Sequence, residues 1–280
     1  MNAFVELFGG VRPVIGMVHL AALPGSPSGG DLTPVLAAAL TDAEALAAGG
    51  VDGMIVENFG DVPFTGGRVP PATVASMAVV CREIRRAHNV PLGVNVLRND
   101  AAAALSVAAV TGADFIRVNV HVGAVVADQG VIEGRARETL ALRESLAPPV
   151  LIFADVAVKH SRPLGMPGPG HIANEARDAF HRGRADALIV SGEATGSAAD
   201  ASSVAALREA VPDAPILLGS GVTAENLEEY WSVADGVIVG SSLEKGGVGG
   251  APVEEARVRA FMEEAARLRR ESGASPGGGA

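Results

Sequence analysis

The chain has 280 residues, of which 48% are hydrophobic and 19% are charged. This length fits one large domain with a buried core, which excludes a disordered chain and a small disulfide scaffold. The formal net charge is −10, and no basic run offsets it, so binding to a nucleic-acid backbone is not expected. The single cysteine, Cys81, cannot form an internal disulfide and fits a reducing cytoplasm.

Apolar stretches end well short of the roughly 18 residues needed to cross a bilayer, and no basic start precedes a cleavable apolar segment near Met1. We therefore expect a cytoplasmic protein with no transmembrane segment. Cys81 lies within the apolar run MAVVCREI, which favours a small core residue over a reactive thiol.

Eight short runs rich in β-branched residues, each bounded by Gly, Pro or Asp, have the pattern of buried strands. They are residues 14–18, 53–56, 92–96, 115–118, 150–154, 187–190, 216–218 and 236–239. Ala-rich, amphipathic stretches follow them near residues 33–48, 71–88, 100–111, 133–146, 172–183, 200–211, 223–231 and 252–270. This alternation predicts parallel strands joined by crossover helices.

Local signals support the alternation. Thr33-Pro34 has the pattern of a helix N-cap followed by proline, and Thr223 is a second N-cap candidate. Gly and Asp recur where a helix ends and the next strand begins, which gives a loose repeat and predicts a (β/α)₈ TIM barrel. The alternative, a doubly wound open sheet, would need a glycine-rich fingerprint after the first strand, where this chain has a long Pro- and Gly-rich loop at 20–31.

We expect one barrel domain over residues 1–271, in which residues 1–12 form a short leading helix or plug. Residues 272–280 (SGASPGGGA) offer nothing to pack and are expected to form a disordered tail. Barrels often associate through their outer helices, so a homo-oligomer is a further expectation.

In a TIM barrel the carboxyl ends of the strands line the mouth, where active sites lie. Polar side chains dominate the first five predicted strand ends: His19, Glu57, Asn58, Asn95, Arg98, Asn99, Arg117, Asn119, His121, Asp155, Lys159 and His160. Small residues dominate the last three: Ser191, Gly192, Thr195, Gly196, Gly219, Ser220, Gly221, Gly240 and Ser241. This division predicts reacting groups on one side of the mouth and a phosphate cradle on the other.

A phosphate in such a barrel is usually held by backbone N–H groups of the loops after strands seven and eight, where glycine and serine allow a close approach. Segments 219–221 and 240–241 fit this role. A helix beginning near Thr223, or a short extra turn after Gly240, would direct its N-terminal dipole at the anion. The alternative is that these glycines simply make tight turns.

Lysine occurs only at Lys159 and Lys245, whereas arginine occurs 20 times. A retained lysine indicates a role that needs a compact ammonium whose pKa can shift. Lys159 follows Asp155 at the mouth, where it can hold an anionic substrate, transfer protons or form a Schiff base. The alternative is a structural ion pair with Asp155 or Glu57. Lys245 lies beyond the last strand and fits a surface or phosphate-side cation.

Arg117, Asn119 and His121 alternate along one strand, so we expect all three on the same face. If that face is the barrel interior, Arg117 must meet a ligand anion or a carboxylate such as Asp155 or Glu57, because unpaired burial is costly. An Arg–Asp pair that only stabilises the barrel is the alternative.

His19 ends the first strand, where it suits proton transfer or hydrogen-bonded packing. A divalent metal such as Mg²⁺ is another use for this mouth, since His19, Glu57, Asp61 and Asp155 can converge on one ion. Their scattered positions form no paired-ligand motif, so we assign no metal ligands, and we expect no organic cofactor. Neither a Walker phosphate loop nor a Gly-x-Ser-x-Gly elbow occurs, so P-loop hydrolysis and a hydrolase triad lack sequence support.

Several long motifs are recognisable as a set. They are VIGMVHL at 14–20, ENFGDVPF at 57–64, GVNVLRND at 93–100, FIRVN at 115–119, ADV at 154–156 and GSGV at 219–222. From residue 12 to 262 the chain resembles the BtpA/SgcQ family. The resemblance implies a barrel similar to the ribulose-phosphate-binding group. It also implies two kinds of function, because BtpA is associated with photosystem I biogenesis at the thylakoid membrane, whereas SgcQ-like members are associated with carbohydrate operons.

Our leading hypothesis is an enzyme that acts on a phosphorylated sugar or a nucleotide-like small molecule. Asp155, Lys159, Glu57 and His19 would handle protons or charge, and the other polar residues of the mouth would orient the substrate. Isomerisation, lyase chemistry and glycosyl-bond cleavage stay open. The alternative is a non-catalytic assembly or stability factor that binds a protein partner, although a scaffold has no need to concentrate ionisable residues at its mouth.

Overall fold

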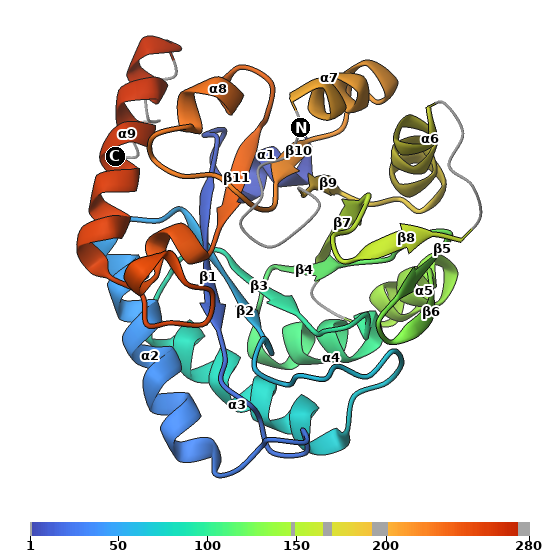
Figure 1. Ribbon diagram of the computed structural model, residues 1–280, viewed down its shortest axis with the longest axis vertical. Helices are drawn as coiled ribbons and strands as arrows, with labels where there is room; N and C mark the ends of the chain where they lie inside the picture. The colour runs from blue at the N-terminus through green and yellow to red at the C-terminus, as the bar shows by residue number, and fades with distance from the viewer. Residues whose placement is uncertain (1, 147–148, 165–169, 192–200, 274–280) are drawn as a thin grey trace.

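The computed structural model describes residues 2–146, 149–164, 170–191 and 201–273. Parallel strands close into a barrel in the order β1-β11-β10-β9-β7-β4-β3-β2. Their bounds are β1 Val14–His19, β2 Gly53–Glu57, β3 Leu92–Asn95, β4 Phe115–Val118, β7 Leu151–Val156, β9 Ala187–Val190, β10 Ile216–Leu218 and β11 Gly236–Val239. All eight predicted strands are present, and the TIM barrel is confirmed (Figure 1).

Helices surround the barrel (Figure 1). They are α2 Leu32–Gly49, α3 Pro71–Ala87, α4 Ala101–Thr111, α5 Ala136–Ser145, α6 His171–Arg177, α7 Ala201–Ala210, α8 Leu227–Trp231 and α9 Glu255–Glu271, and the π-helix η1 Asp178–Arg182 continues α6. Two predicted N-caps are wrong. Asp31, not Thr33, caps α2 by accepting a hydrogen bond from the Thr33 N–H at 3.0 Å. The helix expected from Thr223 begins at Leu227.

The recurrent Gly/Asp pattern has a structural cause at the amino end of the barrel. Four aspartates that precede strands each accept a hydrogen bond at 2.7–2.8 Å from a backbone N–H of a neighbouring strand segment. The pairs are Asp52 with Val14, Asp114 with Leu92, Asp186 with Ile152, and Asp235 with Ile216. Each aspartate also pairs with an arginine of an outer helix: Arg269, Arg85, Arg143 and Arg208, respectively. The repeat therefore joins adjacent strands to the helical layer.

The lower half of the barrel lumen is apolar. It is filled by Ile15, Met17, Ile55, Phe115, Phe153, Ala187, Ile189, Leu217 and Ile238. The Phe115 and Phe153 rings stack with centroids 4.4 Å apart. Helix α1 (Ala3–Leu7) covers this amino end. The ring centroids of Phe4 and Phe153 lie 5.7 Å apart there, and those of Phe8 and Phe115 lie 6.3 Å apart. The filled floor leaves the carboxyl end of the strands as the place for a ligand.

A small antiparallel sheet was not expected from the sequence. It has the order β6-β5-β8 and consists of β5 Ala124–Ala127, β6 Gly130–Glu133 and β8 Ser161–Pro163. The Leu164 N–H donates to the Ala124 carbonyl at 3.2 Å, which extends the contact beyond β8. This sheet fixes the chain directly after His160, and residues 165–169 lie outside the described residues.

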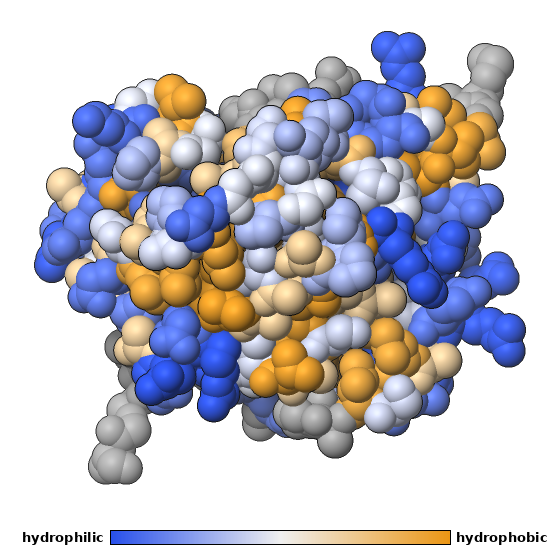
Figure 2. Space-filling model, turned by 90° about the horizontal axis from the view of Figure 1, so that it is seen from below, coloured by the Kyte–Doolittle hydropathy of each residue, from blue (hydrophilic) through white to orange (hydrophobic). Residues whose placement is uncertain are grey.

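Within the described ranges, α2 alone is long and apolar enough to cross a membrane by length and composition. It lies in the outer layer of the barrel beside α3 and α9, where Ala43 and Leu46 are fully buried. That position accounts for its apolar composition. On the side seen from below in Figure 1, hydrophobic residues lie scattered among hydrophilic ones (Figure 2). Single exposed valines such as Val79 of α3 and Val110 of α4 are ordinary on a protein surface.

We predict that Asp186→Ala lowers the free energy of unfolding by about 1–3 kcal/mol, because the Ile152 N–H and the Arg143 guanidinium both lose their acceptor. Urea denaturation monitored by circular dichroism measures this. Asp178→Ala is the matched control. Asp178 pairs only loosely with Arg182, at 3.7 Å on the surface, so we expect a change within about 0.5 kcal/mol. Equal effects of the two substitutions would contradict the role given to Asp186.

Candidate active site

Polar residues replace apolar ones at the carboxyl end of the lumen. Glu57 is in register with His19 on one side and with Asn95 on the other, and Asn95 is in register with Arg117. Neighbours in a parallel register point to the same face, and Met17, two residues before His19, belongs to the lumen cluster. These four side chains therefore form one ring above the apolar floor. With Asn119, Asp155, Lys159, Ser191, Gly219 and Gly240, they are called the rim below.

A buried ion pair crosses the rim between β4 and β7. Arg117 Nη2 donates to Asp155 Oδ1 at 2.9 Å, and Arg117 Nε lies 3.2 Å from both carboxylate oxygens. Asn119 Nδ2 donates to Asp155 Oδ2 at 2.5 Å. Both side chains of the pair are at most 3% exposed. Burial favours the neutral guanidine, but the charges of Asp155 and Glu57 outweigh this and raise the pKa of Arg117.

A second polar group lies on β1, β2 and β3. Asn95 Nδ2 donates to Glu57 Oε2 at 2.5 Å. The other oxygen, Glu57 Oε1, lies 3.7 Å from His19 Nε2. At the other nitrogen of the imidazole, His19 Nδ1 lies 2.6 Å from Glu244 Oε1, and Glu244 is only 1% exposed. A histidine held between two carboxylates can accept and return a proton without leaving its place.

Lys159 stands apart from the paired groups. Its ammonium forms no ion pair or hydrogen bond with any residue that the structure describes. Burial is the main cause that lowers the pKa of Lys159, and Arg117 lowers it further, whereas Glu57 and Asp155 act in the opposite direction. Its backbone carbonyl accepts from Arg98 Nη2 at 2.6 Å, so Arg98 holds the Lys159 backbone in place. The structural ion pair considered for Lys159 is therefore absent from the described part of the chain.

Two buried polar atoms of the rim have no partner among the described residues: Asn119 Oδ1 and Ser191 Oγ. Two glycines lie beside them. A Cβ atom on Gly219 would come within 2.7 Å of Ser191 Oγ and 3.3 Å of Arg117 Nη2, and one on Gly240 would come within 2.9 Å of His19 Cε1. Larger residues at these positions would press on the polar groups, so the small-residue loops and the ionisable groups do meet at one rim.

Two predicted substrate-binding residues brace loops instead of entering the rim. Asn58 accepts from the Leu97 N–H at 2.7 Å and donates to Asp61 Oδ2 at 3.0 Å. Asn99 accepts from the Val120 N–H at 2.8 Å and donates to the Val120 carbonyl at 2.9 Å. Their amide groups are occupied by the protein, and both residues connect the ends of neighbouring strands.

The expectation that His121 shares a face with Arg117 and Asn119 is wrong. Strand β4 ends at Val118, and the chain then turns, so His121 Nε2 bonds the Gly183 carbonyl at 2.7 Å. His121 lines a pocket of about 520 Å³ between α5 and η1, outside the rim. His160 is exposed and follows Lys159 at a left-handed φ of 57°.

Of the remaining residues predicted to hold a phosphate, some lie outside the described part of the chain and the others lie in two short turns. Gly192, Thr195 and Gly196 lie outside the described residues. The short turn expected after Gly240 exists as the 3₁₀ helix η2, Ser241–Leu243. Asn226 accepts from the Thr223 N–H at 2.8 Å and donates to the Gly221 carbonyl at 2.9 Å, so this side chain closes the turn that begins at Gly221, directly after Ser220.

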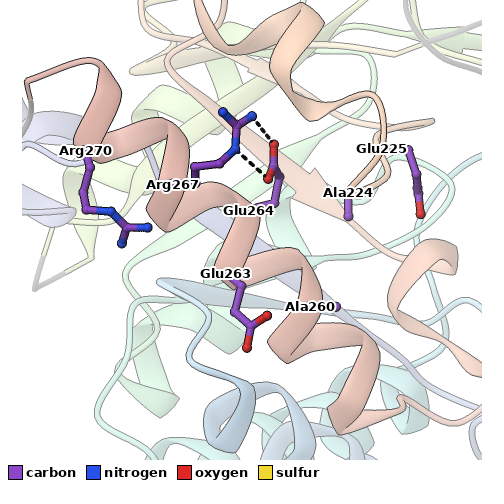
Figure 3. A pocket seen from close by; sticks show the side chains of 7 residues that line it. All are labelled: Ala224, Glu225, Ala260, Glu263, Glu264, Arg267 and Arg270. Atoms are coloured by element: carbon purple, nitrogen blue, oxygen red, sulfur yellow. Dashed lines mark hydrogen bonds and ion pairs between the residues drawn. The ribbon is translucent and has the colours of Figure 1, made fainter.

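A second surface pocket, of about 490 Å³, lies on α9 and the segment before α8 (Figure 3). Arg267 and Glu264 pair within it, and no predicted site residue lines it. Across the described ranges, no three His, Cys, Asp or Glu side chains gather in a way that could hold a metal ion. Asp61, one of the four metal candidates, is occupied by Asn58 and by the Leu23 N–H.

Two acidic residues near the rim were not found from the sequence. Glu244 contacts His19 but lies in the Gly-rich segment after β11, where only Lys245 was considered. Glu175 of α6 accepts from the Ala157 N–H at 3.3 Å, which supports the left-handed turn between Asp155 and Lys159. Burial raises the pKa of Glu175. The sequence signal that could have identified Glu175 is its position as a carboxylate on the helix that follows the end of β7.

Comparison with known proteins agrees with this architecture. The model of the BtpA family matches residues 11–267. The chain belongs to the BtpA family. The family expected from the motifs is therefore confirmed.

Two relatives are similar over almost their whole length. The chain is 46% identical over 253 residues to the photosystem I biogenesis protein BtpA of Synechocystis sp., which covers 90% of this chain and 87% of that protein. It is also 46% identical over 262 residues to an uncharacterized protein of Thermococcus kodakarensis, covering 93% and 98% of the two chains.

Solved structures with the same barrel are more distant in sequence. N-(5′-phosphoribosyl)anthranilate isomerase from Pyrococcus furiosus has a TM-score of 0.55 and 17% identity and covers 91% of this chain and all of its own. A structure named native KDPGal has a TM-score of 0.57 and 16% identity, covering 92% of this chain and 96% of its own. At such low identity these likenesses show that the BtpA-family chain shares their fold.

We predict that Asp155→Asn lowers the free energy of unfolding by about 3–5 kcal/mol, because it removes the ion-pair partner of the buried Arg117 guanidinium. Lys159→Met is the control at the same rim, and it should not destabilise the protein, since the Lys159 ammonium has no described partner to lose. Chemical denaturation of both variants measures the difference. A large loss of stability in Lys159→Met would show that Lys159 is structural.

Proposed function

We propose that this BtpA-family barrel is an enzyme that acts on a phosphorylated sugar or a nucleotide-like small molecule at its rim. The main support is a set of groups with no partner among the described residues: the Lys159 ammonium, Asn119 Oδ1 and Ser191 Oγ. Eight buried side-chain atoms of the described residues lack a partner, and two of them share the rim with the Lys159 ammonium, which supports a ligand at this mouth.

The unpaired groups differ in what they would bind. Lys159 offers a cation for a phosphate, Asn119 Oδ1 can only accept from a donor such as a hydroxyl, and Ser191 Oγ can do either. A phosphorylated polyol carries all the matching groups. Gly219 leaves room beside Ser191 Oγ, and Gly240 leaves room beside His19. The Gly219 N–H already donates to the Val190 carbonyl at 2.7 Å, so the proposed phosphate donors are the other backbone N–H groups of 219–221 and 240–241. The phosphoribosyl compound named in one structural neighbour agrees with this ligand class by analogy.

Proton transfer falls to His19, Glu57 and Lys159 in this proposal. Asp155 was also a candidate, but both of its oxygens already accept hydrogen bonds from Arg117 and Asn119. Asp155 therefore holds the guanidinium, which can face the substrate. His19 Nε2 and Glu57 Oε1 lie 3.7 Å apart and can act on one substrate atom from two sides. An isomerase, a lyase and a glycosyl-bond-cleaving enzyme can all use such a pair.

The proposed setting is the cytoplasm, as the single buried cysteine suggests. A divalent metal such as Mg²⁺ would enter with the phosphate, because the described side chains form no metal-binding cluster. Burial raises the pKa of the Cys81 thiol to about 12, so this residue plays no part in the proposed chemistry.

A non-catalytic assembly factor is the second candidate, since a 46% identical relative bears the name photosystem I biogenesis protein. Such a factor needs a surface for a protein partner but has no use for an unpaired ammonium inside a barrel mouth. Phosphorylated ligands that bind the rim would favour the enzyme. A protein partner whose binding survives Lys159→Ala, with no rim ligand found, would favour the assembly factor.

A thermal-shift screen of phosphorylated sugars and nucleotides, with and without Mg²⁺, tests the proposal. A ligand present at 100 times its dissociation constant should stabilise the protein by about 2.7 kcal/mol. Ser191→Ala should raise the stability of the free protein, because it removes the desolvation cost of a buried hydroxyl that has no described partner, but should weaken binding about 3- to 10-fold. The proposal fails if no phosphorylated compound binds, or if binding is unaffected by substitutions across the rim.

We predict that ligand binding weakens as the pH rises through the pKa of Lys159. Burial lowers that pKa in the folded protein, so the ammonium loses its charge at a lower pH than an ordinary lysine does. Calorimetric titrations between pH 7 and the alkaline range, about pH 10, measure the dependence. Lys159→Arg should remove the alkaline loss, because arginine stays charged. Lys159→Met should bind weakly at every pH, and wild-type affinity in that variant would contradict a role for the ammonium.

A further inference from the structure

His19 is fixed in position by groups from three parts of the chain. Its Nδ1 lies 2.6 Å from Glu244 Oε1, 225 residues further along the chain. Its ring packs on Phe59 with the centroids 4.4 Å apart. Its second nitrogen, Nε2, faces Glu57 Oε1 at 3.7 Å. The ring therefore has one tightly bonded nitrogen and one more open nitrogen at the rim.

Glu244 is a deeply buried carboxylate with few partners. It is 1% exposed, and its second oxygen, Oε2, accepts from the Gly250 N–H at 2.9 Å. Burying a carboxylate is costly unless both oxygens are bonded. No lysine or arginine among the described residues pairs with Glu244, so the His19 N–H is the donor that completes its bonding. An ionised carboxylate only accepts, which requires the proton on Nδ1.

The loop that carries Glu244 is itself held in place. Glu244 and Val253 form an antiparallel bridge, and the Lys245 N–H donates to the Pro252 carbonyl at 2.9 Å. Asp42 of α2 accepts from the Val253 N–H at 2.9 Å. The segment between Glu244 and Val253 is therefore a closed loop tied to the helical layer, and it presents a single carboxylate to the back of His19.

We propose that Glu244 is a positioning residue that holds His19 in the Nδ1–H tautomer, so that Nε2 is left unprotonated as the proton acceptor of the rim. The assignment rests on the function proposed above. Nε2 would take a proton from a bound substrate, and the resulting imidazolium would be stabilised by Glu244 and Glu57. The same nitrogen would then return the proton to another substrate atom, so the protein is unchanged at the end.

The surroundings of Nε2 agree with this direction. A Cβ atom on Gly240 would lie 3.6 Å from Nε2 and 2.9 Å from Cε1, so the glycine keeps the space beside the nitrogen clear. Asn95 holds Glu57 through Oε2, and Glu57 Oε1 lies 3.7 Å from Nε2, beyond hydrogen-bond distance, so Glu57 competes less for the ring proton than Glu244 does at 2.6 Å from Nδ1. Asp155 is a poorer acceptor in the same rim because Arg117 and Asn119 already occupy its oxygens.

The experiment is two-dimensional ¹H–¹⁵N NMR of the histidine rings in the full-length, ¹⁵N-labelled protein at an alkaline pH. The chain has six histidines, and His19→Asn identifies the signals of His19. We expect the Nδ1–H tautomer in the wild type. Glu244→Gln should reverse it, because the new amide can accept from Gly250 and donate to Nδ1, which moves the ring proton to Nε2. Glu244→Asp is the control, since it keeps an acceptor only.

Each outcome decides the proposal. A wild-type ring protonated at Nε2 alone, or at both nitrogens at that pH, overturns it without any variant. An unchanged tautomer in a folded Glu244→Gln protein also overturns it, and the wild-type spectrum remains decisive if that variant does not fold. The spectra need no substrate, so they are independent of the ligand screen. Absence of a phosphorylated ligand would refute the proposed function while the tautomer assignment was judged separately.

Discussion

The ion pair between Arg117 and Asp155 is the constraint around which the upper half of the barrel is arranged. A guanidinium placed in the lumen of a closed barrel must meet a carboxylate, and β7 supplies Asp155 across from β4. Phe115 and Phe153 lie two residues before Arg117 and Asp155 on the same strands and form an apolar layer. The Arg117–Asp155 ion pair therefore separates this filled floor from the polar rim. Every other rim residue is placed relative to that boundary.

Much of the fold was predictable because the strands are short, β-branched and regularly bounded. The Gly/Asp repeat carried more information than the pattern alone revealed, since each aspartate binds a neighbouring backbone segment and an arginine of an outer helix. The β5–β6–β8 sheet was missed because only Ile132 of its strands is buried, so they lack the apolar pattern of the barrel strands. Such strands depend on pairing with distant segments, which a local pattern does not record.

The rim was predictable for a different reason. Once eight parallel strands are assigned, their carboxyl ends must meet, so His19, Glu57, Asn95, Arg117 and Asp155 follow from the fold. The errors lie one step beyond the strand ends. His121 was assigned by continuing an alternation past Val118, where the strand stops. Glu244 was missed because its loop returns to His19 only through tertiary contacts.

The rim contains two kinds of polar group, and their difference bears on function. Asp155 and Asn58 have their hydrogen bonds satisfied within the protein, so they can be explained by stability alone. The unpaired atoms of Asn119 and Ser191 differ, because each carries a desolvation cost of about 1–3 kcal/mol that no group in the described part of the chain offsets. A barrel that only needed to be stable would place apolar or small side chains there. The uncompensated cost at these positions is therefore the strongest physical reason to assign a ligand to this mouth.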